Sequence, residues 1–217
     1  MHETVLNRRL RVLASLAQSI GLFAIFYYYV FLRIRPALFY QQKPQVFVLD
    51  SHFFRSMVTH PGGMVDYLAA FLSPWLAWDW LGALVLTLLV MLICWATRGF
   101  LAAGAGAASE AACLLPAVFI LMVLGQYIHP VPLCVGLSIT LLGANLYARL
   151  GGCRVGIRLA AFATASLAIY FVTAGLYSVF ACLCGCYEWS VKRQRWLGAA
   201  CVACAAAVPY AAGWWPF

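Results

Sequence analysis

The sequence predicts an all-α protein: a polytopic transmembrane helical bundle of about six spans, with an interfacial amphipathic helical loop after the first span. Of the 217 residues, 65% are hydrophobic and 9% are charged, whereas soluble domains are about 45–50% apolar and about 25% charged. The apolar residues form long runs, and a helix needs about 20 of them to cross a hydrocarbon core of ~30 Å. Barrel strands would instead show alternating segments of about 10 residues.

The whole chain, 1–217, is interpreted as one transmembrane domain with an extramembrane loop at 33–79. Pro36 lies just beyond the first apolar run, where a helix commonly ends. The stretch 99–109, rich in Gly and Ala, is either a flexible turn or a helix face that packs closely against a neighbour. The predicted spans are about 12–32, 81–96, 112–127, 133–150, 159–183 and 197–215.

The first span is interpreted as uncleaved. Three arginines, Arg8, Arg9 and Arg11, precede it. The apolar stretch that follows is longer than the 7–15 residues of a signal-peptide core, and no small-residue cleavage site comes after it. A compact basic cluster before the first span favours a cytoplasmic N-terminus, here in the bacterial inner membrane.

The remaining charges do not orient the chain. The net charge is +8 with 14 Lys and Arg, and cytoplasmic loops normally carry the excess of these residues. Under the six-span arrangement they divide seven to each side. The basic run 192–195 falls on the side opposite the N-terminus and is an objection to this orientation. Nucleic-acid binding is not expected, because no basic stripe is interleaved with aromatic residues.

The loop 33–79 is the least apolar part of the chain. Residues Phe53–Met57 predict the start of a short helix that Asp50 or Ser51 could cap, and Pro61-Gly62-Gly63 then breaks the chain. Residues 64–72 place Met64, Val65, Leu68, Phe71 and Leu72 on one helical face, which predicts a helix lying on the membrane surface. A Trp-rich belt follows, and such rings favour the membrane interface. Its members are Trp75, Trp78 and Trp80.

This loop also holds the candidate catalytic residues Asp50, His52, Arg55 and Asp66. A carboxylate and an imidazole near a membrane surface could act as acid, base or metal ligand. The alternative is that Asp50 caps a helix, Arg55 pairs with lipid phosphate and His52 has no role. The spacing Asp-x-His is not by itself a ligand signature. The neighbouring His60-Pro-Gly-Gly63 is either a simple turn or a phosphate-binding nest of backbone amides.

The nine cysteines are interpreted as packing residues. Their odd number and scattered spacing do not resemble a disulfide framework. Structural zinc needs four ligands, and the Cys182–Cys186 and Cys201–Cys204 groups have only Glu188 nearby in sequence. We therefore predict no metal and no cofactor. No predicted span carries a charge near its centre, which argues against an ion-coupled transporter.

Several stretches resemble an uncharacterised bacterial membrane family, domain of unknown function 6057. Members of that family tend to be longer, so the resemblance implies a short or truncated member, or one piece of a split protein. The family brings no established activity. The matching stretches are Phe39-Tyr-Gln-Gln42, Leu49-Asp-Ser-His-Phe-Phe-Arg55, His60-Pro-Gly-Gly-Met-Val-Asp-Tyr-Leu68, Trp80-Leu-Gly-Ala83 and Gly125-Gln-Tyr-Ile-His-Pro130.

Three functions fit the sequence. The favoured one is a non-enzymatic accessory or scaffold module of the bacterial inner membrane. Its expected partners are the lipid bilayer and either other membrane subunits or a missing C-terminal part. An alternative is a fragment of a polyprenyl-phosphate-dependent glycosyltransferase, whose architecture is similar and in which Asp50 or Asp66 would be the functional carboxylate. A second alternative is a small-molecule or lipid transporter.

Overall fold

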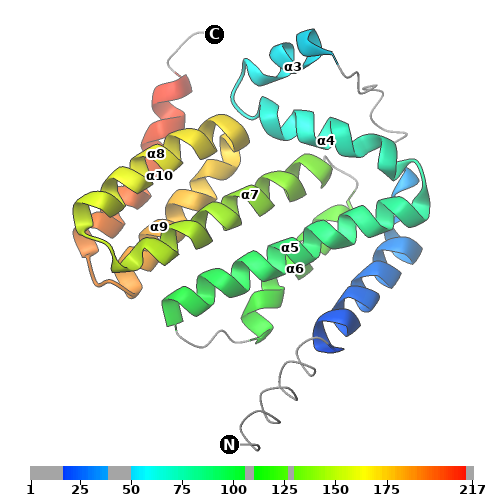
Figure 1. Cartoon of the computed structure of the whole chain (residues 1–217), viewed down its shortest axis with the longest axis horizontal. Coiled ribbons are helices and arrows are strands. Elements are labelled where there is room, and N and C mark those ends of the chain that lie inside the picture. Colours follow the sequence, from blue (N-terminus) through cyan, green and yellow to red (C-terminus); the bar gives the residue numbers. More distant parts are fainter. Residues whose placement is uncertain (1–16, 39–49, 106–109, 127–129, 214–217) are drawn as a thin grey trace, which may run out of the picture.

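The computed structural model describes residues 17–38, 50–105, 110–126 and 130–213, which form an all-α bundle without strands (Figure 1). Four helical segments among these residues are long and apolar enough to cross a membrane: Ala17–Ile34, Asp79–Gly104, Val131–Gly152 and Val155–Ser190. Two shorter helical segments, Ala112–Leu124 and Arg195–Val208, are also apolar. The all-α class predicted from the sequence is therefore confirmed.

The N-terminal helix is described from Ala17 and ends in a π-helical turn, η1 (Val30–Ile34). The elements that follow it along the described chain are α3 (Ser51–Val58), α4 (Gly63–Leu76), α5 (Asp79–Ala105), α6 (Glu110–Leu124), α7 (Pro130–Arg149), η2 (Leu150–Gly152), α8 (Val155–Thr173), η3 (Ala174–Leu176), α9 (Tyr177–Ser190) and α10 (Arg195–Gly213).

The predicted fifth span, 159–183, is not one continuous helix. The chain turns back at η3, where Ala174 has φ 46°, so α8 and α9 lie side by side in opposite directions. Arg158 near the start of α8 meets Glu188 near the end of α9, and the rings of Tyr170 and Tyr177 meet beside the turn. The apolar run therefore folds into a helical hairpin.

The predicted second span, 81–96, is too short. Helix α5 continues through Arg98 to Ala105, because the small residues after Arg98 allow close helix packing. Gly99 shows this directly, since a Cβ at this position would lie 2.9 Å from the Cγ atom of Asn145 on α7. Of the two interpretations of the Gly/Ala stretch, a close-packing helix face is correct for residues 99–105.

The helix pair α3 and α4 lies across one end of the bundle, as the upper right of Figure 1 shows. Helix α4 packs on α5, α7 and α8 through one face that includes the buried residues Val65, Ala69 and Leu76. The predicted surface helix is present but extends to Leu76, and part of its apolar face contacts protein. We call this end of the bundle the α4 end.

A backbone hydrogen bond fixes the α3–α4 turn to the hairpin. The Gly62 amide donates to the Phe171 carbonyl over 2.9 Å, and this carbonyl lies in the last turn of α8, where helix carbonyls lack partners within the helix. Gly62 has φ +89°, and an added Cβ would lie 3.0 Å from the Cβ of Ala174. The α3–α4 turn and the break between α8 and α9 thus stabilise each other.

Two cores fill the bundle. The first is almost entirely aliphatic and joins the N-terminal helix, α4, α5, α6 and the first half of α7. The second contains several aromatic rings and joins the end of α7 with α8, α9 and α10. Charged side chains are buried only beside the second core, within the part of the chain that the structure describes.

Candidate functional site

The four candidate residues predicted in the loop lie on the surface at the α4 end. Asp50 immediately precedes α3, His52 and Arg55 lie on α3, and Asp66 lies in the first turn of α4. All four side chains are exposed. Among the described residues, no hydrogen bond or ion pair joins any two of these four side chains. Helix α3 contacts α4 through the rings of Phe53 and Phe54 against Tyr67.

The capping prediction for Asp50 is correct in position and wrong in mechanism. Asp50 is the N-cap residue of α3, but its side chain makes no capping hydrogen bond. Its backbone carbonyl accepts the Phe54 amide at 3.0 Å. The Pro-Gly-Gly segment forms a turn, and its amides are already used: Gly62 donates to Phe171 and Gly63 donates to the His60 carbonyl at 3.1 Å. Neither amide is free to form a phosphate-binding nest.

A cluster of polar side chains that the sequence did not reveal lies beside the second core. Arg158 on α8 and Glu188 on α9 form an ion pair in which Arg158 Nη2 donates to Glu188 Oε1. Their exposed fractions are 3% and 0%. The hydroxyl of Tyr147 on α7 donates to the same carboxylate oxygen over 2.8 Å. One buried carboxylate therefore connects three helices.

Aromatic rings enclose the ion pair. The Tyr147 ring makes edge contacts with Phe162 and Tyr187, with centroids 6.1 and 6.4 Å apart. The Tyr187 hydroxyl donates to the Ala148 carbonyl at 3.0 Å. Buried ions are strongly destabilising when one partner is lost, because the other charge is left without water or a counter-charge. This arrangement makes Glu188 and Arg158 depend on each other for burial.

The sequence interpretation placed both residues in loops, and the structure corrects it. Arg158 belongs to the first turns of α8 and Glu188 to the last turn of α9. They lie near one end of their helices and not at mid-length, so the expectation of no charge at the centre of a span holds for this pair. The signal that could have revealed them is weak: a lone Glu in an apolar segment needs a basic partner.

The hydrogen-bonding capacity of the cluster is only partly filled by the described residues. Glu188 Oε2 and Arg158 Nε have no hydrogen-bond partner among them, and the same holds for Asn145 Oδ1 and Ser166 Oγ. Other buried hydroxyls bond locally: those of Thr87, Thr97 and Thr140 donate to carbonyls four residues earlier. Such bonds satisfy a hydroxyl inside a helix without linking it to a neighbouring helix.

The packing role predicted for the cysteines fits the buried ones only, because Cys153, Cys182 and Cys186 are exposed. Cys113, Cys134, Cys184 and Cys201 are buried, and all nine are free thiols. In the described ranges, no group of three or more His, Cys, Asp or Glu side chains lies close enough to hold a metal ion.

Exposed charge differs between the two ends of the bundle. The end opposite α4, which we call the basic end, is formed by the loops at 149–154 and 191–195, and an added Cβ on Gly151 would lie 3.2 Å from Lys192 Nζ. These loops contain five cations and no acid: Arg149, Arg154, Lys192, Arg193 and Arg195.

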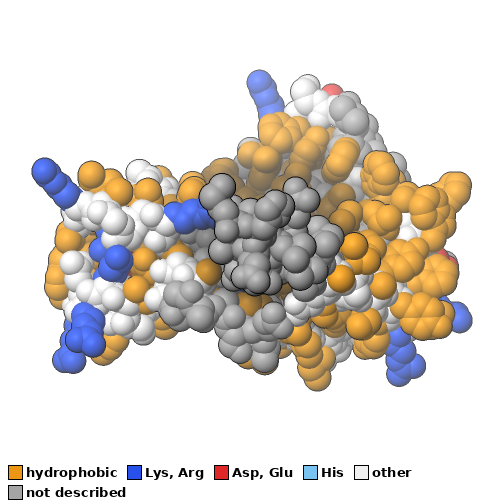
Figure 2. All heavy atoms as spheres, turned by 60° about the horizontal axis from the view of Figure 1, so that its bottom comes forward, with side chains coloured by type: hydrophobic (Ala, Val, Ile, Leu, Met, Phe, Trp, Pro, Cys, Tyr) orange, Lys and Arg blue, Asp and Glu red, His pale blue; other side chains and the backbone are white. Residues whose placement is uncertain are grey.

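The α4 end carries both signs. Its exposed residues include Arg33, Arg35 and Arg55 together with Asp50, Asp66 and Asp79. Figure 2 shows the same separation on the face it draws: several Lys and Arg side chains gather at the left, and the visible acidic atoms lie toward the top and right.

The fold defines the class of this protein. It is an α-helical bundle with helices long and apolar enough to span a membrane. The family is also shown. The model of a family of unknown function, DUF6057, matches residues 10–216, so the chain belongs to that family. No curated protein matches the chain, and no solved structure matches it. The family resemblance predicted from the sequence is confirmed.

Proposed function

We propose that this protein is a non-enzymatic accessory or scaffold module of the bacterial inner membrane. The observation that supports this proposal is a buried ion pair that links three helices. Arg158 on α8 and Tyr147 on α7 both donate to the Glu188 carboxylate on α9, which links three helices in one arrangement. A rigid apolar bundle held in this way suits a protein that supports partners in the bilayer.

The proposed orientation places the N-terminus and the basic end in the cytoplasm. Cytoplasmic loops carry the excess of Lys and Arg. The helical hairpin of α8 and α9 moves the run 192–195 to the same end as Arg149 and Arg154, which removes the objection that the six-span arrangement raised. The three arginines that precede the first helix in sequence would lie on that side as well.

Reporter fusions at opposite ends of the bundle test this orientation. One reporter is active only in the cytoplasm and the other only outside it, and each is fused after Gly63 and after Arg193. We expect the Gly63 fusions to report the outside and the Arg193 fusions to report the cytoplasm. If both sites report the same side, the α8–α9 hairpin does not cross the bilayer twice and the proposed arrangement is wrong.

The scaffold role is tested by asking whether the chain still joins a larger complex when its candidate catalytic residues are replaced. The four exposed loop residues are replaced together (Asp50→Asn, His52→Ala, Arg55→Gln, Asp66→Asn), and the chain is extracted from its own membrane in mild detergent. We expect the variant and the natural chain to co-migrate in the same larger complex in equal yield. A chain that migrates alone in both forms would contradict the scaffold role.

One observation favours the glycosyltransferase alternative. Asp50 and Asp66 are exposed at the α4 end, which the proposed orientation places outside the cytoplasm, where lipid-linked sugars would be used. This alternative requires that Asp50→Asn or Asp66→Asn inserts normally and causes a polyprenyl-phosphate-linked sugar to accumulate in the membrane. Unchanged levels of that lipid in both variants would exclude the alternative.

A further inference from the structure

A cavity of about 130 Å³ lies between the N-terminal helix, α5 and α6, away from the buried ion pair. A single water molecule takes up about 30 Å³ in the liquid, so the cavity has room for a larger group. The residues that line it are Gln18, Ser19, Leu22, Met91, Cys94, Trp95, Arg98, Cys113 and Leu114.

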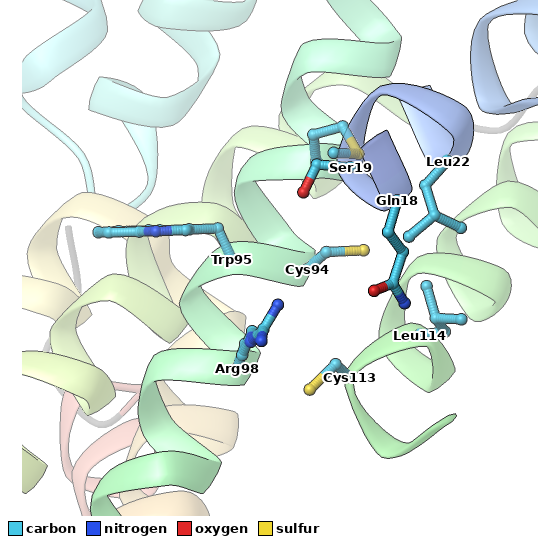
Figure 3. A pocket seen from close by; sticks show the side chains of 9 residues that line it. Gln18, Ser19, Leu22, Cys94, Trp95, Arg98, Cys113 and Leu114 are labelled. Carbon is cyan, nitrogen blue, oxygen red and sulfur yellow. The ribbon is translucent and has the colours of Figure 1, made fainter. Parts of the chain in front are cut away.

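Figure 3 shows how the polar side chains of this cavity are arranged. Arg98 and Cys94 extend from α5 toward Gln18 of the N-terminal helix, and Cys113 of α6 lies below them. Trp95 points away from the other labelled side chains and is 58% exposed. Because exposed Trp side chains favour the headgroup region of a membrane, Trp95 places this cavity at that depth.

Arg98 is the charged residue among the described residues that line this cavity. Its side chain is exposed, and the described residues contain one ion pair, which joins Arg158 to Glu188 and leaves Arg98 without a counter-charge among them. None of the described residues that line the cavity is acidic. A cation in an apolar helix, facing a cavity without a carboxylate, is complementary to an anion from outside the chain.

The cavity is also graded in polarity along the helices. Arg98 and Gln18 lie toward the basic end, whereas Leu22 and Met91 lie farther toward the middle of their helices. Seven residues separate Met91 from Arg98, which is about 10 Å along a helix. A ligand with a charged head and an apolar body would match both parts at once.

We propose that this cavity binds an anionic phospholipid, with the phosphate on the Arg98 guanidinium and the start of the acyl chains against Leu22 and Met91. A guanidinium can donate two parallel hydrogen bonds to phosphate oxygens. The site goes beyond the proposed scaffold role and does not depend on it, because a lipid can bind there whether or not the bundle supports other proteins.

Three probes distinguish binding of the lipid phosphate from binding of the acyl chains. They are added to the delipidated chain, purified in detergent. Phosphatidylglycerol offers both parts, diacylglycerol offers the tails without phosphate, and inorganic phosphate offers the anion without tails. Native mass spectrometry measures the retained lipid, and the unfolding midpoint compares stabilisation by inorganic phosphate with stabilisation by phosphatidylglycerol. We expect phosphatidylglycerol to bind at least about fivefold more than diacylglycerol, in line with the contribution of one cation near a membrane surface.

The variant Arg98→Gln removes the charge and keeps a polar side chain of similar length. We expect it to lose about fivefold in phosphatidylglycerol retention and to bind diacylglycerol as the natural chain does. The matched control is Arg149→Gln, which removes an exposed cation at the basic end that does not line the cavity. It should retain phosphatidylglycerol like the natural chain.

Two results would overturn the proposal. Equal retention of phosphatidylglycerol and diacylglycerol by the natural chain would show that phosphate is not recognised. Stabilisation by inorganic phosphate as large as that by phosphatidylglycerol would show a site for free anions and not for lipid. Both comparisons use the natural chain, so they decide the question even if Arg98→Gln does not fold.

Discussion

The two ends of the bundle differ in the burial and in the sign of their charged residues. At the basic end, one Arg and one Glu are buried together between α8 and α9, and the exposed loops around them carry cations only. At the α4 end, the described charged residues are exposed, both signs are present, and the helices α3 and α4 cover the bundle.

This difference indicates that charge has two separate uses in this chain. The buried pair at the basic end joins helices, and the surrounding cations can set the orientation of the chain in a membrane. The exposed charges at the α4 end are solvated and contribute little to the stability of the fold. Substitutions at the two ends should therefore have effects of different size, and the predictions below follow that order.

The largest effect is expected from Glu188→Gln. This substitution leaves the Arg158 guanidinium buried without a counter-charge, which typically costs about 3–5 kcal/mol of folding free energy. Unfolding by a denaturing detergent, titrated into mild micelles, measures the change. The matched control is Asp66→Asn, the same loss of a carboxylate at an exposed position, which should shift the unfolding free energy by less than about 0.5 kcal/mol.

The double substitution Arg158→Met with Glu188→Leu sharpens this test. Replacing a buried ion pair by apolar side chains of similar volume is often neutral or stabilising. We therefore expect the double variant to unfold closer to the natural chain than Glu188→Gln does, with a remaining loss of about 1–3 kcal/mol because the Tyr147 hydroxyl loses its acceptor. Equal destabilisation of the single and double variants would mean that the pair does more than hold its helices together.

The all-α class, helices long and apolar enough to cross a membrane, and the main elements could be predicted from the sequence. Long apolar runs identified the helices, and the Pro-Gly-Gly segment marked the turn before α4. The face of α4 followed from apolar spacing, although Phe71 is 44% exposed while Ala69, which the pattern did not select, is buried. Apolar periodicity cannot tell a lipid-facing side from a protein-facing side, because both favour the same residues.

The hairpin of α8 and α9 could not be predicted from local sequence. Residues 159–183 form a continuous apolar run without proline, in which Gly175 is the single conventional break signal. The turn depends on tertiary contacts: the Gly62 amide bonds to Phe171, and Gly62 lies against Ala174. Both contacts come from a segment more than 100 residues away in sequence.

Missing that turn also concealed the candidate site and the charge distribution. Arg158 and Glu188 are 30 residues apart, and they meet only if the chain folds back between them. With a single crossing, the two residues fall in different loops, and the run 192–195 falls on the side opposite Arg149 and Arg154. One unrecognised turn therefore accounts for the even division of cations between the two sides.

A smaller effect is expected from Gly99→Ala near the basic end. The added Cβ would overlap the side chain of Asn145, and overpacking of this kind costs about 1–3 kcal/mol. The control is Gly156→Ala on α8, where nothing lies within 4 Å of an added Cβ and where Ala favours the helix by roughly 0.5–1 kcal/mol. If both variants unfold alike, the contact of α5 with α7 is looser than described.

At the α4 end, Gly62→Ala should act locally. A side chain at φ +89° costs about 1–2 kcal/mol in a left-handed conformation, and the new methyl group also presses on Ala174. We expect faster proteolysis in the α3–α4 turn with a nearly unchanged unfolding midpoint for the bundle. A loss of global stability as large as that of Glu188→Gln would show that the α3–α4 layer is integral to the bundle.

The smallest effects are expected at the exposed loop residues. Each of Asp50→Asn, His52→Ala and Arg55→Gln alters a side chain that is exposed, so the unfolding free energy should change by less than about 0.5 kcal/mol. The same detergent titration measures all three variants beside Glu188→Gln. A loss above 1 kcal/mol in any of them would reveal a structural contact at the α4 end and would weaken the contrast between the two ends. A small loss combined with a cellular defect would instead assign that residue to binding or chemistry, because stability alone would not explain the defect.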